Sequence, residues 1–320
     1  MGYNIGMAEK RKTPASSTGQ RVRKATKRQA RTKAKAETRS SSAVPNSFQL
    51  TRQVLRVFKE HWKTLLGIVT VYLILNIVFA SGLSNLGSTV SNIKSNLDQS
   101  SSSAHPIAQG ISGFGALVGS AGSSGSSTGS VLQSLLFVIE SLVIIWALRQ
   151  LLAGKKISVK QAYYRSMYPL IPFLLVIFVI ILQLLPVTLG AAVLSNVVTS
   201  IISSLSLATW LSWIFFIVLG AWSFYMISGS IFALYIVTLP DMQPRDALRS
   251  AKKLVRYRRW QVIPKVLFLP CFILLAMAVI VVPLIIFASF AVAPVFYILS
   301  MLTILFIHTY FYSLYRSLLE

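Results

Sequence analysis

The 320-residue chain is too apolar and too sparsely charged for an ordinary water-soluble domain: hydrophobic residues make up 54%, charged residues 12%, and the mean hydropathy is +0.67. Its 31 Lys and Arg residues against 8 Asp and Glu residues give a formal net charge of +23, which in so apolar a chain indicates basic segments on one side of a membrane, with anionic lipid as their partner. Cys271 is the only cysteine, which excludes an intramolecular disulfide, a zinc cluster and a redox pair.

Residues 1–45 are predicted to form a disordered, basic cytoplasmic tail, because large apolar residues are almost absent from them. The run from Arg21 to Lys35 is dense enough in positive charge to attract nucleic acid. It contains no aromatic side chain for base stacking, so nucleic acid is not the expected partner. Attraction to anionic headgroups, at about 1 kcal/mol per charge near the surface, is the simpler interpretation.

Long uncharged runs predict an all-α, polytopic transmembrane bundle over residues 46–320. No Asp, Glu, Lys, Arg or His occurs between Ser166 and Pro240, and a bilayer core of about 30 Å needs roughly 20 apolar residues per crossing helix. Six crossings are predicted, at Thr64–Ser81, Val131–Leu148, Leu170–Leu189, Leu207–Val237, Val266–Phe287 and Val295–Tyr315.

Two segments between these crossings need separate interpretations. Residues 82–130 are rich in Ser and Gly, which predicts an exposed, flexible extracytoplasmic loop whose weakly apolar patch, Ile107–Val118, rests on the membrane surface. Gly190–Ser206 is apolar enough to be a further crossing. An odd number of crossings would place the basic loops on opposite faces, so six is preferred.

With six crossings and both termini in the cytoplasm, every Lys and Arg except Lys94 lies on the cytoplasmic side. This distribution follows the positive-inside rule. It predicts a multi-pass protein of the bacterial plasma membrane.

An amphipathic stretch precedes each odd-numbered crossing, which indicates three copies of a surface helix, a crossing and a return crossing. In Phe48–Leu66 and Gln243–Ile263, apolar and basic side chains each recur at helical spacing. The expected helices lie at the headgroup level with apolar faces toward the lipid and basic side chains on its phosphates. The predicted headgroup-binding residues are Arg52, Arg56, Lys59 and Lys63 in the first stretch, and Arg245, Arg249, Lys252, Lys253, Arg256, Arg258 and Arg259 in the last.

The middle copy is shorter, with Ser158 and Gln161 spaced as a capping box and Val159, Tyr163 and Met167 as its apolar stripe. The alternative for all three copies is that each is only the end of one long, tilted helix.

Two stretches carry a resemblance to a known family. Leu239-Pro240 followed by Ala247–Val255 and Trp260, and Gly154-Lys155-Lys156-Ile157-Ser158 followed by Ala162, resemble a loose family of bacterial six-helix membrane proteins. That family includes the membrane domain fused to some glycerophosphodiester phosphodiesterases and related domains of unknown function. The resemblance covers about residues 46–318 and implies a six-helix membrane fold. It supplies no catalytic residues, and the soluble phosphodiesterase barrel is absent from this chain.

Glu140 is the only acidic residue within a predicted crossing, which makes it a candidate proton or cation site. The competing interpretation is a structural pair with a polar group on a neighbouring helix, and Asn76 and Gln183 are the candidates. His308 stands apart from other metal ligands and is expected to be a helix-contact residue. The seven prolines in or beside crossings are expected mainly at helix ends, where proline commonly starts or stops a helix.

No phosphate-cradling glycine loop, paired carboxylates or nucleophile motif is evident. The sequence therefore predicts a non-enzymatic membrane protein without a cofactor, which engages anionic phospholipid or organises a complex with other membrane proteins. The alternative is a transporter or permease subunit with Glu140 at a buried coupling site.

Overall fold

The computed structural model describes residues 45–80, 87–92, 95, 106–120, 127–201 and 204–319, and every regular element in those ranges is a helix. Six of the helical stretches are long and apolar enough to cross a membrane, which confirms the predicted all-α, six-helix architecture. They are Ser47–Phe79, Val131–Leu152, Leu170–Val198, Ser206–Ile236, Arg259–Phe287 and Phe290–Leu319. The predicted basic tail lies outside the described residues, apart from Pro45, and stays a prediction.

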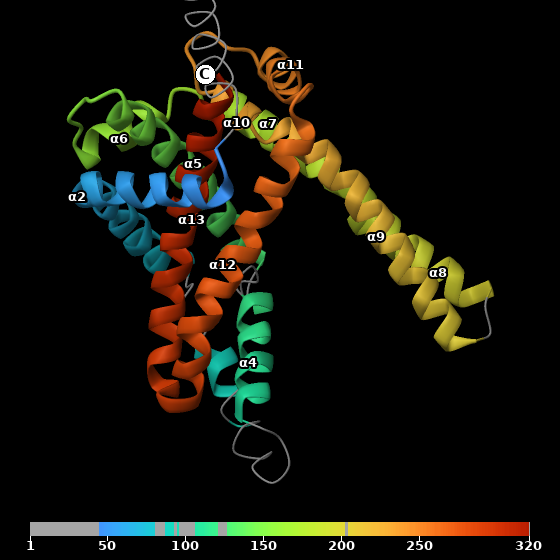
Figure 1. Ribbon diagram of the computed structural model, residues 1–320. Helices are drawn as coiled ribbons and strands as arrows, with labels where there is room; N and C mark the ends of the chain where they lie inside the picture. Colours follow the sequence, from blue (N-terminus) through green and yellow to red (C-terminus); the bar gives the residue numbers. More distant parts are fainter. Residues whose placement is uncertain are drawn as a thin grey trace, which may run out of the picture. The chain divides into compact units, whose positions relative to one another are not determined.

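Helix α2 (Ser47–Ala80) joins the first amphipathic stretch to the first crossing through a kink at His61, where φ is −118° and ψ is 24°. Figure 1 shows the two parts running in clearly different directions. The first part is therefore a separate segment, not the straight continuation of the crossing helix. Leu50 and Val54 on this part are buried, while Phe48 and Leu55 are exposed.

The middle of the chain forms α5 (Ser127–Leu152), the short α6 (Val159–Ser166) and a long hairpin. The predicted cap of α6 is present, because the Gln161 backbone N–H donates to the Ser158 hydroxyl at 3.3 Å. The hairpin comprises α7 (Leu170–Leu185), a π-helical turn (Pro186–Gly190), α8 (Ala191–Ile201) and α9 (Leu205–Ser230). Residues 190–201 thus prolong the third crossing and do not add a seventh.

The last part contains α10 (Ala233–Ile236), α11 (Pro244–Val255), α12 (Arg259–Phe287) and α13 (Ser289–Leu319). Pro244 occupies the start of α11 and Asp246 its first turn, as the sequence predicts. The expectation that prolines stand at helix ends is wrong for four of them, because Pro264, Pro270 and Pro283 lie inside α12 and Pro294 inside α13. Membrane helices tolerate such prolines where neighbouring groups satisfy the freed backbone carbonyls.

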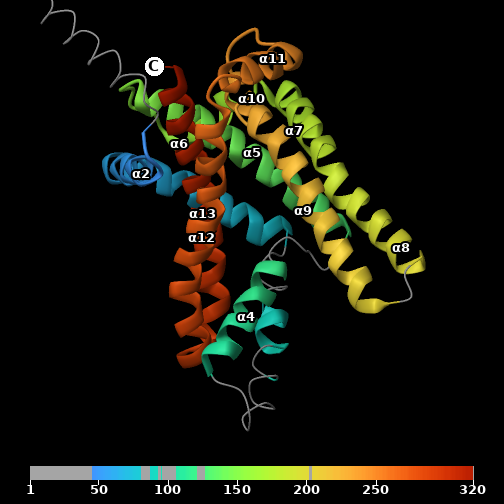
Figure 2. The same cartoon turned by 45° about the vertical axis from the view of Figure 1, so that its right-hand side comes forward.

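The Ser/Gly-rich segment contains a helix, α4 (Pro106–Ser120), which packs against α12 (Figures 1 and 2). Contact is close at Gly110, where an added Cβ atom would lie 2.9 Å from a methyl group of Val282. The apolar patch within this segment is therefore used against another helix of the protein. Leu117 of α4 is fully buried.

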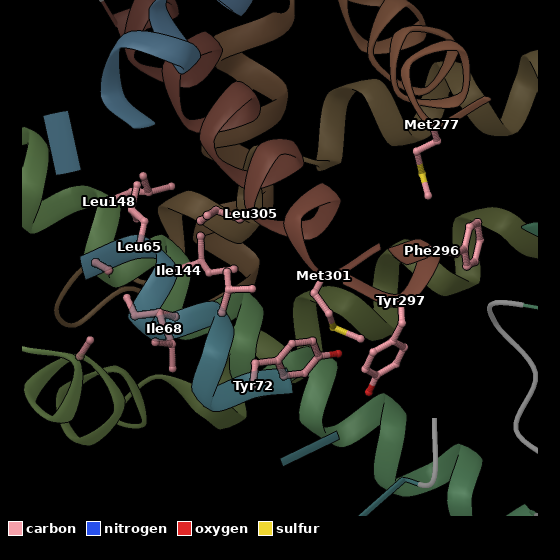
Figure 3. Close-up of a cluster of buried hydrophobic side chains, with 14 of the residues drawn as sticks. Leu65, Ile68, Tyr72, Ile144, Leu148, Met277, Phe296, Tyr297, Met301 and Leu305 are labelled. Carbon is pink, nitrogen blue, oxygen red and sulfur yellow. The ribbon is translucent and has the colours of Figure 1, made fainter. Parts of the chain in front are cut away.

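Apolar side chains of α2, α5, α12 and α13 form the main buried cluster (Figure 3). Both ribbon views place α6, α10, α11 and the end of α13 at one end of the bundle, and α4 beside the other end of α12 (Figures 1 and 2). The loops that carry the predicted basic segments therefore gather at the same end.

Candidate functional site

A basic cavity of about 630 Å³ lies between α11, α9 and the start of α12. Its lining combines six cationic side chains with one tyrosine and one leucine, and includes no acidic residue. The lining residues are Tyr225, Arg245, Leu248, Arg249, Lys252, Lys253, Arg256 and Arg259.

The two faces of α11 explain why the cations point into this cavity. Ala247, Ala251 and Val255 recur at intervals of four and are fully buried, because this face packs against helices of the bundle. The basic residues on the rest of the surface are exposed. The expectation that the apolar face of this segment lies toward lipid is therefore wrong for α11: its small side chains allow close packing on the protein.

The opposite wall of the cavity is held by a stacked arginine. The guanidinium carbon of Arg259 lies 4.5 Å from the centre of the Tyr225 ring, a cation–π contact that fixes its position. The guanidinium group also lies beside Gly229, where an added Cβ atom would be in ordinary van der Waals contact with it at 3.4 Å.

The six cations of the basic cavity lack polar partners in the part of the chain that the structure describes. Apart from the ring contacts of Arg256 and Arg259, none of them donates a hydrogen bond or forms an ion pair there. Asp246 and Asp241 are exposed on neighbouring positions and do not line the cavity. Such a group of free donors and positive charges is suited to phosphate oxygens.

The structure brings together six of the seven predicted cations of this region, and Arg258 is the exception. Arg52, Arg56, Lys59 and Lys63 are exposed on α2 and take no part in the cavity. Sequence reasoning missed Tyr225. It lies well inside the predicted crossing Leu207–Val237, and no local signal separates it from the other aromatic side chains of that run.

A second candidate site surrounds Glu140 on α5, whose side chain is 1% exposed. The Tyr163 hydroxyl of α6 lies 2.8 Å from Glu140 Oε2, while Oε1 has no hydrogen-bond partner among the described residues. The short amphipathic α6 is thus attached to the bundle by a polar contact from its expected apolar stripe. Sequence reasoning did not identify Tyr163 as this partner.

The Tyr163 hydroxyl also lies 3.2 Å from the backbone oxygen of Ile68 on α2. Burial, and after it the adjacent Glu140 carboxyl, raises the pKa of Tyr163, so the phenol keeps its proton. The single hydroxyl hydrogen is therefore shared between the Glu140 carboxyl and the Ile68 carbonyl oxygen, as in a three-centre hydrogen bond.

The predicted partners of Glu140 have other contacts. Asn76 accepts a hydrogen bond from the Tyr297 hydroxyl at 2.7 Å and donates to the Tyr72 hydroxyl at 3.5 Å, and both rings belong to the buried cluster (Figure 3). The suggestion of Gln183 is wrong, because its amide donates to Ser230 at 2.9 Å in the hairpin. Periodicity places a residue on a helix face but does not select among neighbouring helices.

Arg149, near the end of α5, is a cation with several oxygen acceptors. It donates to the backbone oxygen of Thr238 at 2.7 Å, to that of Tyr235 at 3.0 Å, and to the Thr238 hydroxyl. Nearby, His308 is buried with Nδ1 3.3 Å from the Tyr235 hydroxyl, in agreement with the predicted helix contact. Among the described residues no group of potential metal ligands is present.

No protein-family model, curated protein or solved structure matches this chain. The resemblance to the six-helix family therefore stays a prediction. The six apolar helices identify the chain as a multi-pass membrane protein.

Proposed function

We propose that this multi-pass protein binds anionic phospholipid through the basic cavity and performs no chemical reaction of its own. The observation that carries the proposal is the set of six cations without polar partners around one cavity. Each Lys or Arg near a membrane surface attracts anionic lipid by about 1 kcal/mol. Arg259, which lines the cavity, is the first residue of the apolar helix Arg259–Phe287, and this supports a position for the cavity near a membrane surface.

The proposal includes the topology. The bacterial plasma membrane, with both termini and the basic cavity on the cytoplasmic side, satisfies the positive-inside rule for every Lys and Arg except Lys94. The inner leaflet then supplies the anionic headgroups. A reporter fused after Arg258 is expected to be cytosolic, and an external reporter would overturn this orientation.

Native mass spectrometry of the full chain, purified in mild detergent, tests the binding. We expect retained phosphatidylglycerol or another anionic phospholipid, and its loss from Arg249→Glu/Lys252→Glu/Arg256→Glu. The matched control is Lys155→Glu/Lys156→Glu/Arg165→Glu, which makes the same charge change at exposed positions away from the cavity. Equal lipid retention by both variants would contradict the proposal. Retention of an acidic protein without lipid would instead support a partner-organising role.

A second candidate function, transport, is favoured by one observation, the buried and unpartnered Oε1 of Glu140. Liposomes that contain the purified protein and an entrapped pH-sensitive dye test it with the proton as the probe. Proton flux that is lost in Glu140→Gln would support a coupling site. Flux no greater than in protein-free liposomes would remove proton transport from the candidates.

A further inference from the structure

We infer that the lipid recognised by the basic cavity carries two phosphate groups in its headgroup, as cardiolipin does. This inference rests on the proposed function and specifies its ligand class. It depends on the length of the cationic wall, on the distribution of its charges and on the apolar surface beside it.

The cationic wall is longer than one phosphate can engage. Arg245, Arg249, Lys252 and Arg256 follow one another by four, three and four residues along α11. At 1.5 Å per residue these eleven steps extend over about 16 Å. A phosphodiester has two free oxygens that bond donors about 3 Å away, so a single phosphate contacts only part of the wall.

The charges extend without a gap from one end of α11 to the other. Arg245 and Arg249 belong to its first half, whereas Lys252 and Arg256 belong to its second half and are joined by Arg259 from α12. Like charges at helical neighbour positions repel one another. Two bridged phosphates can neutralise both ends of this row of charges with one molecule, which a lipid with a single phosphate cannot do.

The neighbouring surface suits acyl chains. Tyr225 lines the cavity, and Trp222 and Val218 precede it at helical spacing on α9, with 66% and 58% of their surfaces exposed. A headgroup held in the cavity therefore has an exposed apolar helix face beside it for its chains. A water-soluble phosphate compound would leave that face unused.

The test compares cardiolipin with phosphatidylglycerol at equal phosphate concentration, added to the delipidated full chain in phosphatidylcholine-containing micelles. Binding is followed by native mass spectrometry and by the rise in thermal midpoint. We expect cardiolipin to bind at least tenfold more tightly. Removing the charge at either end, with Arg245→Gln/Arg249→Gln or Lys252→Gln/Arg256→Gln, should abolish the preference while phosphatidylglycerol binding persists.

The control Lys155→Gln/Lys156→Gln should keep the full preference, and thermal midpoints without lipid establish that each variant is folded. Equal affinities per phosphate in the native chain would overturn the two-phosphate inference and leave the proposed function standing. Absence of binding by either lipid would overturn both. Inorganic pyrophosphate that competes as well as cardiolipin would show a soluble diphosphate to be the ligand and would also overturn the inference.

Discussion

Arginines at the same end of the bundle have opposite surroundings. Arg149 has three oxygen acceptors around its guanidinium group, two of them backbone oxygens. Arg249 and Arg256, on the wall of the basic cavity, have no polar acceptor among the described residues. All three residues are arginines, so residue type does not distinguish Arg149 from the other two. What separates them is whether the fold itself satisfies the side chain: Arg149 stabilises the protein, whereas the cavity arginines are available to a ligand.

The largest effect is expected from Arg149→Ala. Its removal leaves the oxygens of Tyr235 and Thr238 without their charged donor at a helix end, where a positive charge is favourable. We expect the free energy of unfolding in detergent to fall by about 3 kcal/mol, since hydrogen bonds to charged groups are individually worth roughly 1.5 to 3 kcal/mol. The free energy of unfolding of Arg149→Lys should lie between those of the native chain and Arg149→Ala, because an ammonium group keeps the charge but cannot form the forked contact.

Thermal or denaturant unfolding followed by circular dichroism measures this loss. A change below about 0.5 kcal/mol, the range of ordinary surface substitutions, would show that the partners of Arg149 do not distinguish it from the cavity arginines.

The contrast between these arginines also shows what the sequence could and could not reveal. The spanning helices were predictable because their runs lack charge, and the steps of three and four between Arg249, Lys252 and Arg256 predicted one shared helix face. The role of Arg149 was not predictable, because its acceptors lie more than eighty residues away along the chain.

The wrong expectation for α11 and the missed partner of Glu140 have the same cause, because both depend on contacts between helices that are distant along the chain. The apolar face of α11 could cover either lipid or protein, and both choices have the same periodicity. The Tyr163 contact to Glu140 depends on how α6 docks against α5, which no local pattern specifies. Sequence thus located the spanning helices and all six of the cavity's cations, while the partners that decide their roles came from packing.

A second test concerns the buried carboxyl. Glu140→Ala removes the partner of the Tyr163 hydroxyl and leaves a void, with an expected loss of about 2 kcal/mol. Glu140→Gln keeps the size, and its amide can donate to the tyrosine oxygen while the tyrosine donates to Ile68. We expect Glu140→Gln to unfold within about 0.5 kcal/mol of the native chain, on the scale of neutral substitutions.

A double-mutant cycle with Tyr163→Phe separates this contact from general packing. Glu140→Ala and Tyr163→Phe should be less than additive, because each removes the same hydrogen bond. Fully additive losses, measured by chemical denaturation in one detergent, would mean that the contact contributes nothing to attaching α6.

A smaller effect is expected at Gly67 of α2, which lies against the start of α6. An added Cβ atom would come within 2.8 Å of a methyl group of Val159, so Gly67→Ala must either turn the Val159 side chain or displace one helix from the other. We expect a net loss of about 1 kcal/mol, since overpacking costs roughly 1 to 3 kcal/mol and alanine regains part of this through helix propensity. The control is Gly115→Ala in α4, where nothing lies within 4 Å and only the propensity gain applies. Thermal midpoints that rise equally in both variants would contradict close packing of α2 on α6.

The smallest effect on stability is expected where the proposed effect on binding is largest. Arg249→Gln/Arg256→Gln removes two exposed cations that have no polar partner among the described residues, and it relieves repulsion along α11. The lipid-free protein should therefore unfold within about 0.5 kcal/mol of the native chain, while the midpoint increase caused by added anionic lipid should shrink. Raising the salt concentration should reduce that increase in the native chain as well, because ions screen exposed charges. A marked loss of lipid-free stability would place these arginines with Arg149 and remove the distinction on which the proposed binding role depends.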